Sequence, residues 1–121
     1  MTKIKESSTR NYNKRSAETE CPVTYTMNKI GGYWKPLILF HLMDGPKRYS
    51  ELKRAIPVVT EKMLIQHLKQ LEADNMIIRK AEPVVPPFVV YSLSCAGENF
   101  KPVMMAMAEW GERERVLSPK S

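Results

Sequence analysis

The sequence predicts a mainly helical α+β fold, and three observations lead to this expectation. The chain has 121 residues, which suits one domain with one modest core. Two short amphipathic segments separated by a tight break lie between residues 50 and 73. Two β-branched and aromatic runs follow directly. The order helix, turn, helix, hairpin predicts a winged helix-turn-helix with a two-stranded wing.

The segments before residue 47 are expected to be an arm and two helices. Residues 1–20 are polar and lack apolar periodicity, which predicts a flexible basic arm. Pro22 suits a first helical turn and Gly31 suits a helix end, so a first helix is expected between them. From Trp34 to Met43 the residues are apolar on nearly every side, which predicts a buried second helix.

The two helices after residue 47 form the predicted helix-turn-helix. Ser50 can cap the first, and Thr60 can cap the second, which is expected to run from Glu61 to about Ala73. On a helical wheel the second helix has a leucine stripe on one side and a polar, basic face on the other. The stripe consists of Leu64, Leu68 and Leu71, and the opposite face with its flanks consists of Lys62, Met63, Gln66, Lys69 and Gln70. Ammonium groups suit phosphates and amides suit adenine edges, so this face predicts DNA recognition; the alternative is an ordinary solvated helix surface.

The wing is predicted from the runs at 76–80 and 88–93, which flank a proline-rich tip. Arg79 and Lys80 are expected to contact the DNA backbone, together with Arg48 and Ser50 before the second helix. Between residues 47 and 80 eight Lys or Arg residues stand against four Asp or Glu, so this segment holds +4 of the net charge of +6. The positive charge is therefore concentrated where DNA would lie.

The chain resembles the HxlR family of winged-helix regulators, which are related to the MarR group. The resemblance is carried by CPVTYTMNKIGGYWKPLILFHLMDGPKRYSELKRAIPVVTEKMLIQHLKQLEADNMIIRK, by VPPFVVYSLSCAG and by AEWGER, and it covers 21–113. It implies homodimers that bind double-stranded operator DNA, with a recognition helix at 60–70 and a wing tip at 83–88. Phe88 is a departure, because the family often has Arg or Lys after the paired prolines. We place the DNA-binding and dimerisation domain at 21–113 and a C-terminal tail at 114–121.

Apolar residues near the C-terminus recur at helical spacing and predict a dimerisation surface. The predicted interface consists of Val23, Met27, Phe100, Val103, Met104, Met107 and Trp110. Pro102 is expected to kink or restart the last helix. Since the central helices already serve the core, the stripe can bury itself against a second subunit; the alternative is packing within its own chain. A dimer would place two recognition helices roughly 34 Å apart and predicts a pseudo-palindromic operator.

Cys21 and Cys95 lack zinc-like spacing and are expected as free thiols. Cys21 lies beside a predicted helix N-terminus, whose positive dipole can lower the pKa of its thiol. The resemblance implies that a cysteine at this position can act as a redox or quinone switch. A small electrophile or oxidant is therefore a candidate effector, and the alternative is a cysteine packed as a small hydrophobe.

Other function classes find little support. His41 and His67 stand apart from any ligand cluster, so no metal or cofactor is predicted, and no phosphate loop or nucleophile elbow indicates an enzyme. No apolar run reaches the roughly 18 to 20 residues that span a bilayer, which predicts a cytoplasmic protein without a membrane segment. The competing function is a winged-helix protein-interaction module without sequence-specific DNA contact, which the cationic helix face disfavours.

Overall fold

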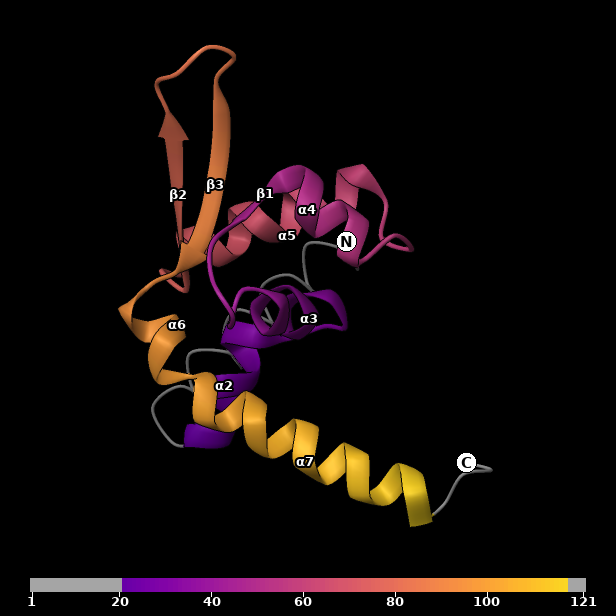
Figure 1. The fold of residues 1–121 in the computed structure, drawn as a ribbon. Helices are drawn as coiled ribbons and strands as arrows, with labels where there is room; N and C mark the ends of the chain where they lie inside the picture. Colours follow the sequence, from indigo (N-terminus) through magenta and orange to yellow (C-terminus); the bar gives the residue numbers. More distant parts are fainter. Residues whose placement is uncertain (1–20, 118–121) are drawn as a thin grey trace, which may run out of the picture. The chain divides into compact units, whose positions relative to one another are not determined.

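The computed structural model describes residues 21–117, so the predicted arm at 1–20 and the last four residues of the predicted tail lie outside it. The chain divides after Gly32 into two compact units (Figure 1). The first contains helix α2 (Pro22–Ile30). The second contains α3 (Trp34–His41), β1 (Lys47–Arg48), α4 (Tyr49–Ala55), α5 (Glu61–Ala73), β2 (Ile77–Glu82), β3 (Phe88–Leu93), α6 (Cys95–Asn99) and α7 (Lys101–Leu117).

Helix α2 begins and ends where the sequence predicts. Cys21 occupies the N-cap position with an extended backbone, and Pro22 takes the first helical position, where its missing N–H costs nothing. Gly31 ends the helix, and a Cβ atom there would lie 2.7 Å from the carbonyl oxygen of Met27. Glycine is therefore required at this helix end by a close approach of the backbone.

The core of the second unit lies between α3 and the helix-turn-helix. Helix α3 packs against both α4 and α5. The predicted leucine stripe of α5 faces this core, with Leu64, Leu68 and Leu71 at most 1% exposed. Burying each such side chain stabilises the fold by about 1.5 to 3 kcal/mol. Helix α3 itself is not buried on every side as predicted, because Phe40 is 44% exposed.

The N-termini of the two helix-turn-helix helices are capped differently. The predicted cap of α5 is confirmed, because the Thr60 hydroxyl oxygen accepts a hydrogen bond from the Met63 backbone N–H at 3.2 Å. The predicted Ser50 cap of α4 is wrong, since that helix already begins at Tyr49. The backbone N–H of Arg48 instead donates to Oε1 of Glu51 at 2.7 Å, so a carboxylate from the first turn does the capping.

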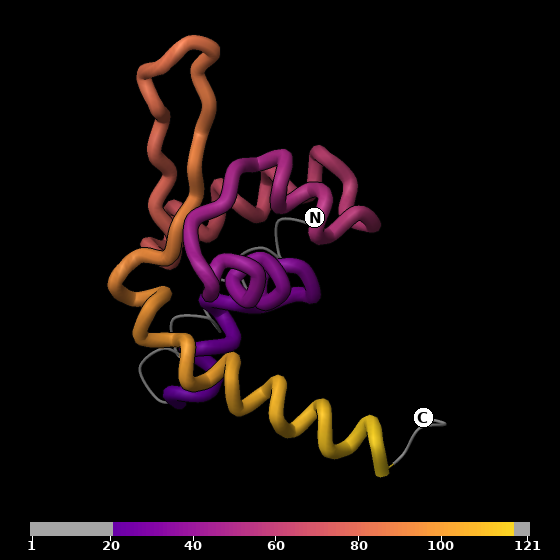
Figure 2. The backbone as a smooth tube through the Cα atoms, in the orientation of Figure 1, coloured from indigo at the N-terminus to yellow at the C-terminus, as the bar shows by residue number. Residues whose placement is uncertain are grey.

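The wing belongs to a three-stranded antiparallel sheet in the order β1-β3-β2, one strand more than predicted. Strands β2 and β3 pair from Ile77 opposite Leu93 to Glu82 opposite Phe88. Ile77 and Leu93 are buried and anchor the base of the hairpin, whose far end extends beyond α4 and α5 (Figures 1 and 2). The extra strand β1 is the two-residue segment before α4, and it pairs with β3.

The C-terminal helices follow the base of the wing directly. The Ser94 hydroxyl accepts from the backbone N–H of Gly97 at 3.1 Å and donates to the carbonyl oxygen of Asn75 at 2.6 Å, which ties α6 to the start of β2. The helix then restarts at α7 with Pro102 in its first turn, as predicted. Helix α7 continues to Leu117, so the segment predicted as a tail begins inside a helix.

Candidate nucleic-acid interface

The face of α5 opposite the leucine stripe is open to solvent. Lys62, Gln66, Lys69 and Gln70 are all exposed, and Met63 is 39% exposed. The helical period explains this arrangement, because residues about half a turn from the buried leucines must point away from the core. The face also contains a residue that the wheel argument missed, Ile65, which is 42% exposed.

The charges of this face are not neutralised by neighbouring acidic groups. Among residues 21–117 the ion pairs are Lys47 with Asp44, Lys80 with Glu82, Lys101 with Glu98 and Arg115 with Glu112. Lys62 and Lys69 take part in none of them. Their ammonium groups are therefore free to pair with an anion, and phosphate is the anion that a basic helix face meets on DNA.

The four predicted backbone contacts lie on three elements, β1, α4 and β2. Arg48 and Ser50 are exposed at the start of α4, and Arg79 and Lys80 are exposed on β2. Adjacent residues of a strand point to opposite faces, so Arg79 and Lys80 leave the hairpin on different sides. Lys80 also lies 3.8 Å from the Glu82 carboxylate. The two residues therefore cannot contact the same stretch of DNA backbone equally.

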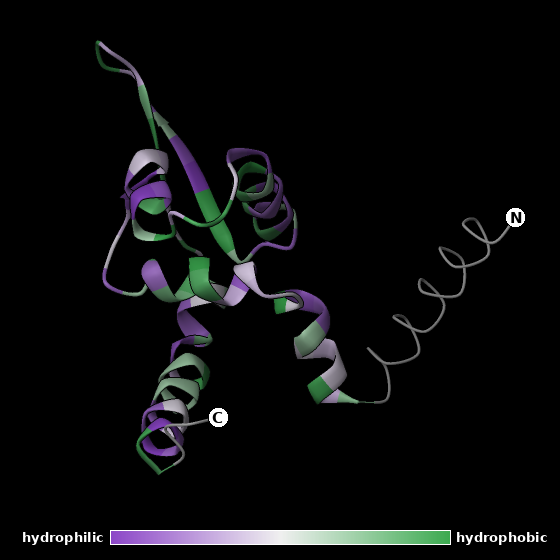
Figure 3. Cartoon of the chain, turned by 90° about the vertical axis from the view of Figure 1, so that its right-hand side faces the viewer, coloured by the Kyte–Doolittle hydropathy of each residue, from purple (hydrophilic) through white to green (hydrophobic). Residues whose placement is uncertain are grey.

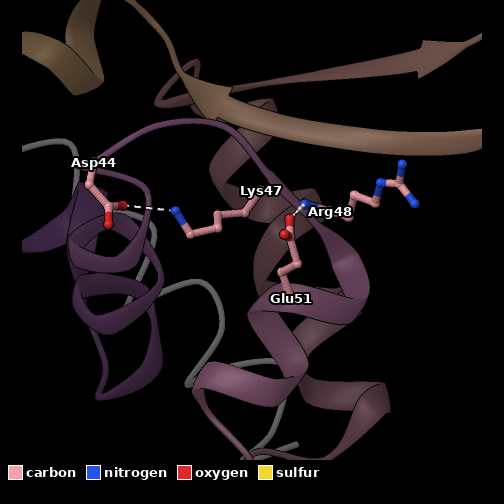
Figure 4. Close-up of polar contacts among 4 residues, drawn as sticks. All are labelled: Asp44, Lys47, Arg48 and Glu51. Carbon is pink, nitrogen blue, oxygen red and sulfur yellow. Dashed lines mark hydrogen bonds and ion pairs between the residues drawn. The ribbon is translucent and has the colours of Figure 1, made fainter.

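Neighbouring Lys47 and Arg48 also point apart (Figure 4). The Lys47 ammonium is bound to Asp44 at 2.8 Å. The Arg48 guanidinium lies over the ring of Phe88, with 3.7 Å between its Cζ atom and the ring centroid. This contact between Phe88 and Arg48 was not predicted, because it depends on the pairing of β1 with β3.

The wing tip between β2 and β3 carries no charge. The connection consists of Pro83, Val84, Val85, Pro86 and Pro87. Val85 is 98% exposed and Val84 is 48% exposed, and the far end of the hairpin carries apolar colour in Figure 3. An apolar tip can contact sugars or a groove wall but offers no side-chain donor to a phosphate.

Most of the predicted dimer interface is solvent-exposed in the single chain. Val103 is 43% exposed, Met107 50% and Trp110 62%, and Phe100 is half-buried. Within the first unit, Val23 is 70% exposed and Met27 is 54% exposed. Figure 3 shows apolar colours along the middle of α7, then hydrophilic colours, and apolar colour again at its last residues.

One predicted interface residue is used inside the chain. Met104 is only 3% exposed, because α7 packs against α3 at this point, and it is removed from the interface. The exposed apolar surface instead continues onto α3 through a groove of about 270 Å³. The groove is lined by Pro36, Leu37, Phe40, Met104, Met107 and Ala108. The α3 side of this surface was not predicted, because that helix was expected to be buried.

Cys21 and Cys95 are both free thiols. The pKa of the Cys21 thiol is lowered, first by a hydrogen bond from the Thr24 side chain and then by the backbone N–H groups of Thr24 and Val23. The direction is the one predicted. The prediction rested on the helix N-terminus, whereas the largest cause of the lowered pKa is the Thr24 side chain.

Two further features of residues 21–117 concern metal binding and membrane crossing. Between Cys21 and Leu117 no group of three or more His, Cys, Asp or Glu side chains could hold a metal ion. None of the helices in that range has the length and apolar character needed to cross a bilayer.

The architecture and the charged helix face define a class of protein. A helix-turn-helix whose second helix presents lysines and amides, followed by a hairpin wing, is a winged-helix transcriptional regulator. Residues 29–118 match the family described as HxlR-like helix-turn-helix, and the chain belongs to this family. The resemblance inferred from the sequence is thereby confirmed.

Individual relatives agree with this assignment. The HTH-type transcriptional regulator YkvN of Bacillus subtilis (strain 168) is 50% identical over 91 residues, which cover 75% of this chain and 77% of YkvN. The redox regulator HypR in its reduced form is 40% identical with a TM-score of 0.77, covering 83% of this chain and 99% of HypR. The reduced transcriptional regulator YodB from B. subtilis is 33% identical with a TM-score of 0.69, covering 84% of this chain and 98% of YodB.

Proposed function

We propose that this regulator binds a pseudo-palindromic operator as a homodimer, with α5 of each subunit in a major groove. The observation that supports this most directly is the exposed, unpaired face of α5 opposite a fully buried leucine stripe. Gln66 and Gln70 would pair with adenine edges, and Met63 would contact a thymine methyl group. Thr60, Lys62 and Lys69 would contact phosphates and fix the helix in register.

The wing and the start of α4 complete the proposed DNA surface. Arg48, Ser50, Arg79 and Lys80 would contact the backbone beside the groove that α5 enters. No catalytic step is part of the proposal. Because the proposed ligand is genomic DNA, the proposal includes a cytoplasmic location.

The second subunit is proposed from the apolar surface of the C-terminal helix. Val103, Met107 and Trp110 lie on one exposed side of α7. In a single chain, their contact with water costs about 25 cal/mol for each Å² of exposed apolar surface. An isologous contact with the same surface of another copy would remove that cost. Phe100 would contribute at its edge, and Val23 and Met27 of α2 are proposed to contact the partner subunit as well.

DNA binding is tested by affinity selection from random duplexes, followed by binding measurements at stepped salt concentrations. The logarithm of the binding constant should fall linearly with the logarithm of the salt concentration, with a slope of about −0.9 for each phosphate contact. A binding constant that does not change with salt would favour the protein-interaction module instead.

Two single variants separate base recognition from phosphate binding. Gln66→Ala should lose discrimination at particular base pairs by about 1 to 3 kcal/mol, whereas Lys69→Ala should weaken all sequences alike and reduce the salt slope by about 1. Lys101→Ala serves as the control, because it removes an equal charge from α7, far along the chain from α5. The Lys101 ammonium is already paired with Glu98 at 2.8 Å. Equal behaviour of Gln66→Ala and Lys69→Ala on all sequences would contradict the assigned roles.

We further propose that Cys21 responds to oxidants or electrophiles. Its lowered thiol pKa raises the fraction of reactive thiolate, and the similar protein HypR is a redox regulator solved in oxidized and reduced forms. With a quinone, the Cys21 sulfur would form a bond to a ring carbon, and the ring would take up a proton to become a hydroquinone thioether. No other reactant is needed for this addition.

Cysteine sensing is tested by operator binding with and without a quinone, or with diamide and a low-molecular-weight thiol, which would join Cys21 in a mixed disulfide as the diamide is reduced to its hydrazine. Cys21→Ser should abolish the response, while Cys95→Ser, which removes the exposed second thiol, should leave it intact. A response that persists in Cys21→Ser would remove this residue from the mechanism.

A further inference from the structure

Arg48 is held in place at both its backbone and its side chain. Its N–H donates to Glu51 at 2.7 Å, and its Cα pairs with that of Val90 across β1 and β3. Its guanidinium carbon lies 3.7 Å from the centroid of the Phe88 ring. Figure 4 shows this side chain extending away from Lys47 and Asp44.

The stack with Phe88 follows from the strand register. Cross-strand partners project from the same face of a sheet, and residues two apart on one strand also share a face. Arg48 pairs with Val90, and Phe88 lies two residues before Val90 on β3. A long side chain at 48 can therefore lie along the face and cover the aromatic ring. The pairing of β1 with β3 thus brings together two residues 40 positions apart in the sequence.

The geometry leaves the guanidinium ready for an anion. The guanidinium lies over the ring, with its Cζ atom 3.7 Å from the ring centroid, and its five N–H donors point outward in its own plane. Within residues 21–117 no carboxylate forms an ion pair with it. An edge with two parallel donors suits a phosphate, which arginine binds in bidentate geometry.

Arg48 is also the stronger of two cations on this face of the wing. Val90 has a cross-strand partner on each neighbouring strand, Arg48 on β1 and Lys80 on β2, so both side chains project from the same face of the sheet. The Lys80 ammonium, however, lies 3.8 Å from the Glu82 carboxylate. That carboxylate offsets the charge of Lys80 before any DNA arrives. Among the described residues, Arg48 is therefore the cation on this face that forms no ion pair.

We infer that Phe88 is a positioning residue, which holds the guanidinium of Arg48 in one orientation for a DNA phosphate beside the wing. This inference rests on the proposed function, since the anion is taken to be operator DNA. The ring reduces the rotamer freedom that Arg48 would otherwise lose on binding. Phe88 itself touches no phosphate in this scheme.

The test is a double-mutant cycle on operator affinity. Phe88→Leu keeps apolar volume but removes the π face, and it should weaken binding about two- to five-fold on all sequences, the range expected for an exposed cation–π contact. Phe88→Trp keeps the ring and should bind within about two-fold of the parent. Arg48→Ala should bind about ten-fold more weakly and lower the salt slope by about 0.9. Adding Phe88→Leu to Arg48→Ala should cause no further loss.

Two controls separate this inference from stability and from overall charge. Thermal unfolding of every variant shows whether the sheet is intact, and Phe88→Trp shows whether restoring a ring restores affinity. Arg115→Ala removes one positive charge from α7 and should leave operator affinity within about two-fold of the parent.

A measurement without DNA tests the stack directly. Ring current from Phe88 should shift the Arg48 side-chain proton resonances upfield, and Phe88→Leu should abolish this shift while Phe88→Trp retains it. Unchanged Arg48 resonances in Phe88→Leu would overturn the inference, as would an equal loss of affinity from Phe88→Leu in the Arg48→Ala background. A parent protein that binds DNA without any salt slope would overturn the proposed function, whereas a parent that binds normally and an equally tight Phe88→Leu would overturn the positioning role alone.

Discussion

Helices α5 and α7 present similar apolar patterns to very different surroundings. The leucines of α5 are at most 1% exposed, while Val103, Met107 and Trp110 of α7 are 43% to 62% exposed. Helix α5 is covered by α3 and by the base of β2, whereas α7 contacts α3 mainly around its buried Met104. Apolar periodicity therefore indicates that a helix face will be covered, and only the structure shows whether its own chain covers it.

Truncating the buried leucine stripe of α5 should have the largest effect on stability. Leu68→Ala removes a side chain that is 1% exposed, and it should lower the free energy of unfolding by about 2 to 5 kcal/mol. The cost arises from lost burial and from a cavity that its neighbours cannot fill. Urea denaturation measures the change. The matched variant Ile65→Ala, on the exposed side of the same helix, should cost under about 1 kcal/mol, and similar losses at both positions would contradict the assigned faces.

A smaller effect is expected on the open surface of α7, and there it should affect association. Trp110→Ala should raise the dissociation constant of the dimer about 30-fold or more, which corresponds to about 2 kcal/mol for an aromatic interface residue. Sedimentation velocity over a dilution series measures this change, with Glu109→Ala as the control on the adjacent helix position. Circular dichroism should show an unchanged helical signal. A parent chain that stays monomeric at high micromolar concentration would contradict the proposed dimer.

The elements of the helix-turn-helix could be predicted closely because local chemistry determines them. Thr60 starts α5, the leucine period orients it, and the runs at 77–82 and 88–93 pair as a hairpin. Two errors arose where competing local choices have similar energies. Ser50 and Glu51 can both cap α4, and the carboxylate reaching back to Arg48 prevails. Met104 and its exposed neighbours on α7 are equally apolar, so the sequence does not distinguish inner from outer residues.

The candidate DNA surface was predictable only in part. The exposed face of α5 follows from the helical period, so Lys62, Gln66 and Lys69 were found from sequence. The stack of Arg48 on Phe88 was not, because a two-residue strand leaves no periodic pattern and its partner lies 40 residues away. Such contacts arise from sheet register, which long-range pairing determines.

The smallest expected effect is a pH dependence of stability that comes from His67, which lies at the edge of the buried stripe of α5. The pKa of His67 is lowered from its ordinary value of 6.5, first by burial and then by Lys35, while a hydrogen bond with the Gln70 side chain acts in the opposite direction. Its Nδ1 atom is buried, and within the described residues it has no hydrogen-bond partner. The folded state therefore disfavours the charged imidazolium. Above the unfolded pKa both states are neutral, and the folded state loses nothing.

Stability should consequently fall as the pH drops below about 6.5, because the unfolded chain takes up the proton before the folded chain does. Urea denaturation at about pH 7.5 and pH 5.5 measures the loss, and His67→Gln should lose less stability than the parent over the same interval. Taking the difference between the two proteins cancels carboxylates common to both, including Asp44. Lys35→Ala should also reduce this loss of stability, but by less than His67→Gln does, because burial lowers the pKa of His67 more than Lys35 does. If His67→Gln loses as much stability as the parent, the imidazole titrates alike in the folded and unfolded chains, and the edge of the α5 stripe is wetter than its burial indicates.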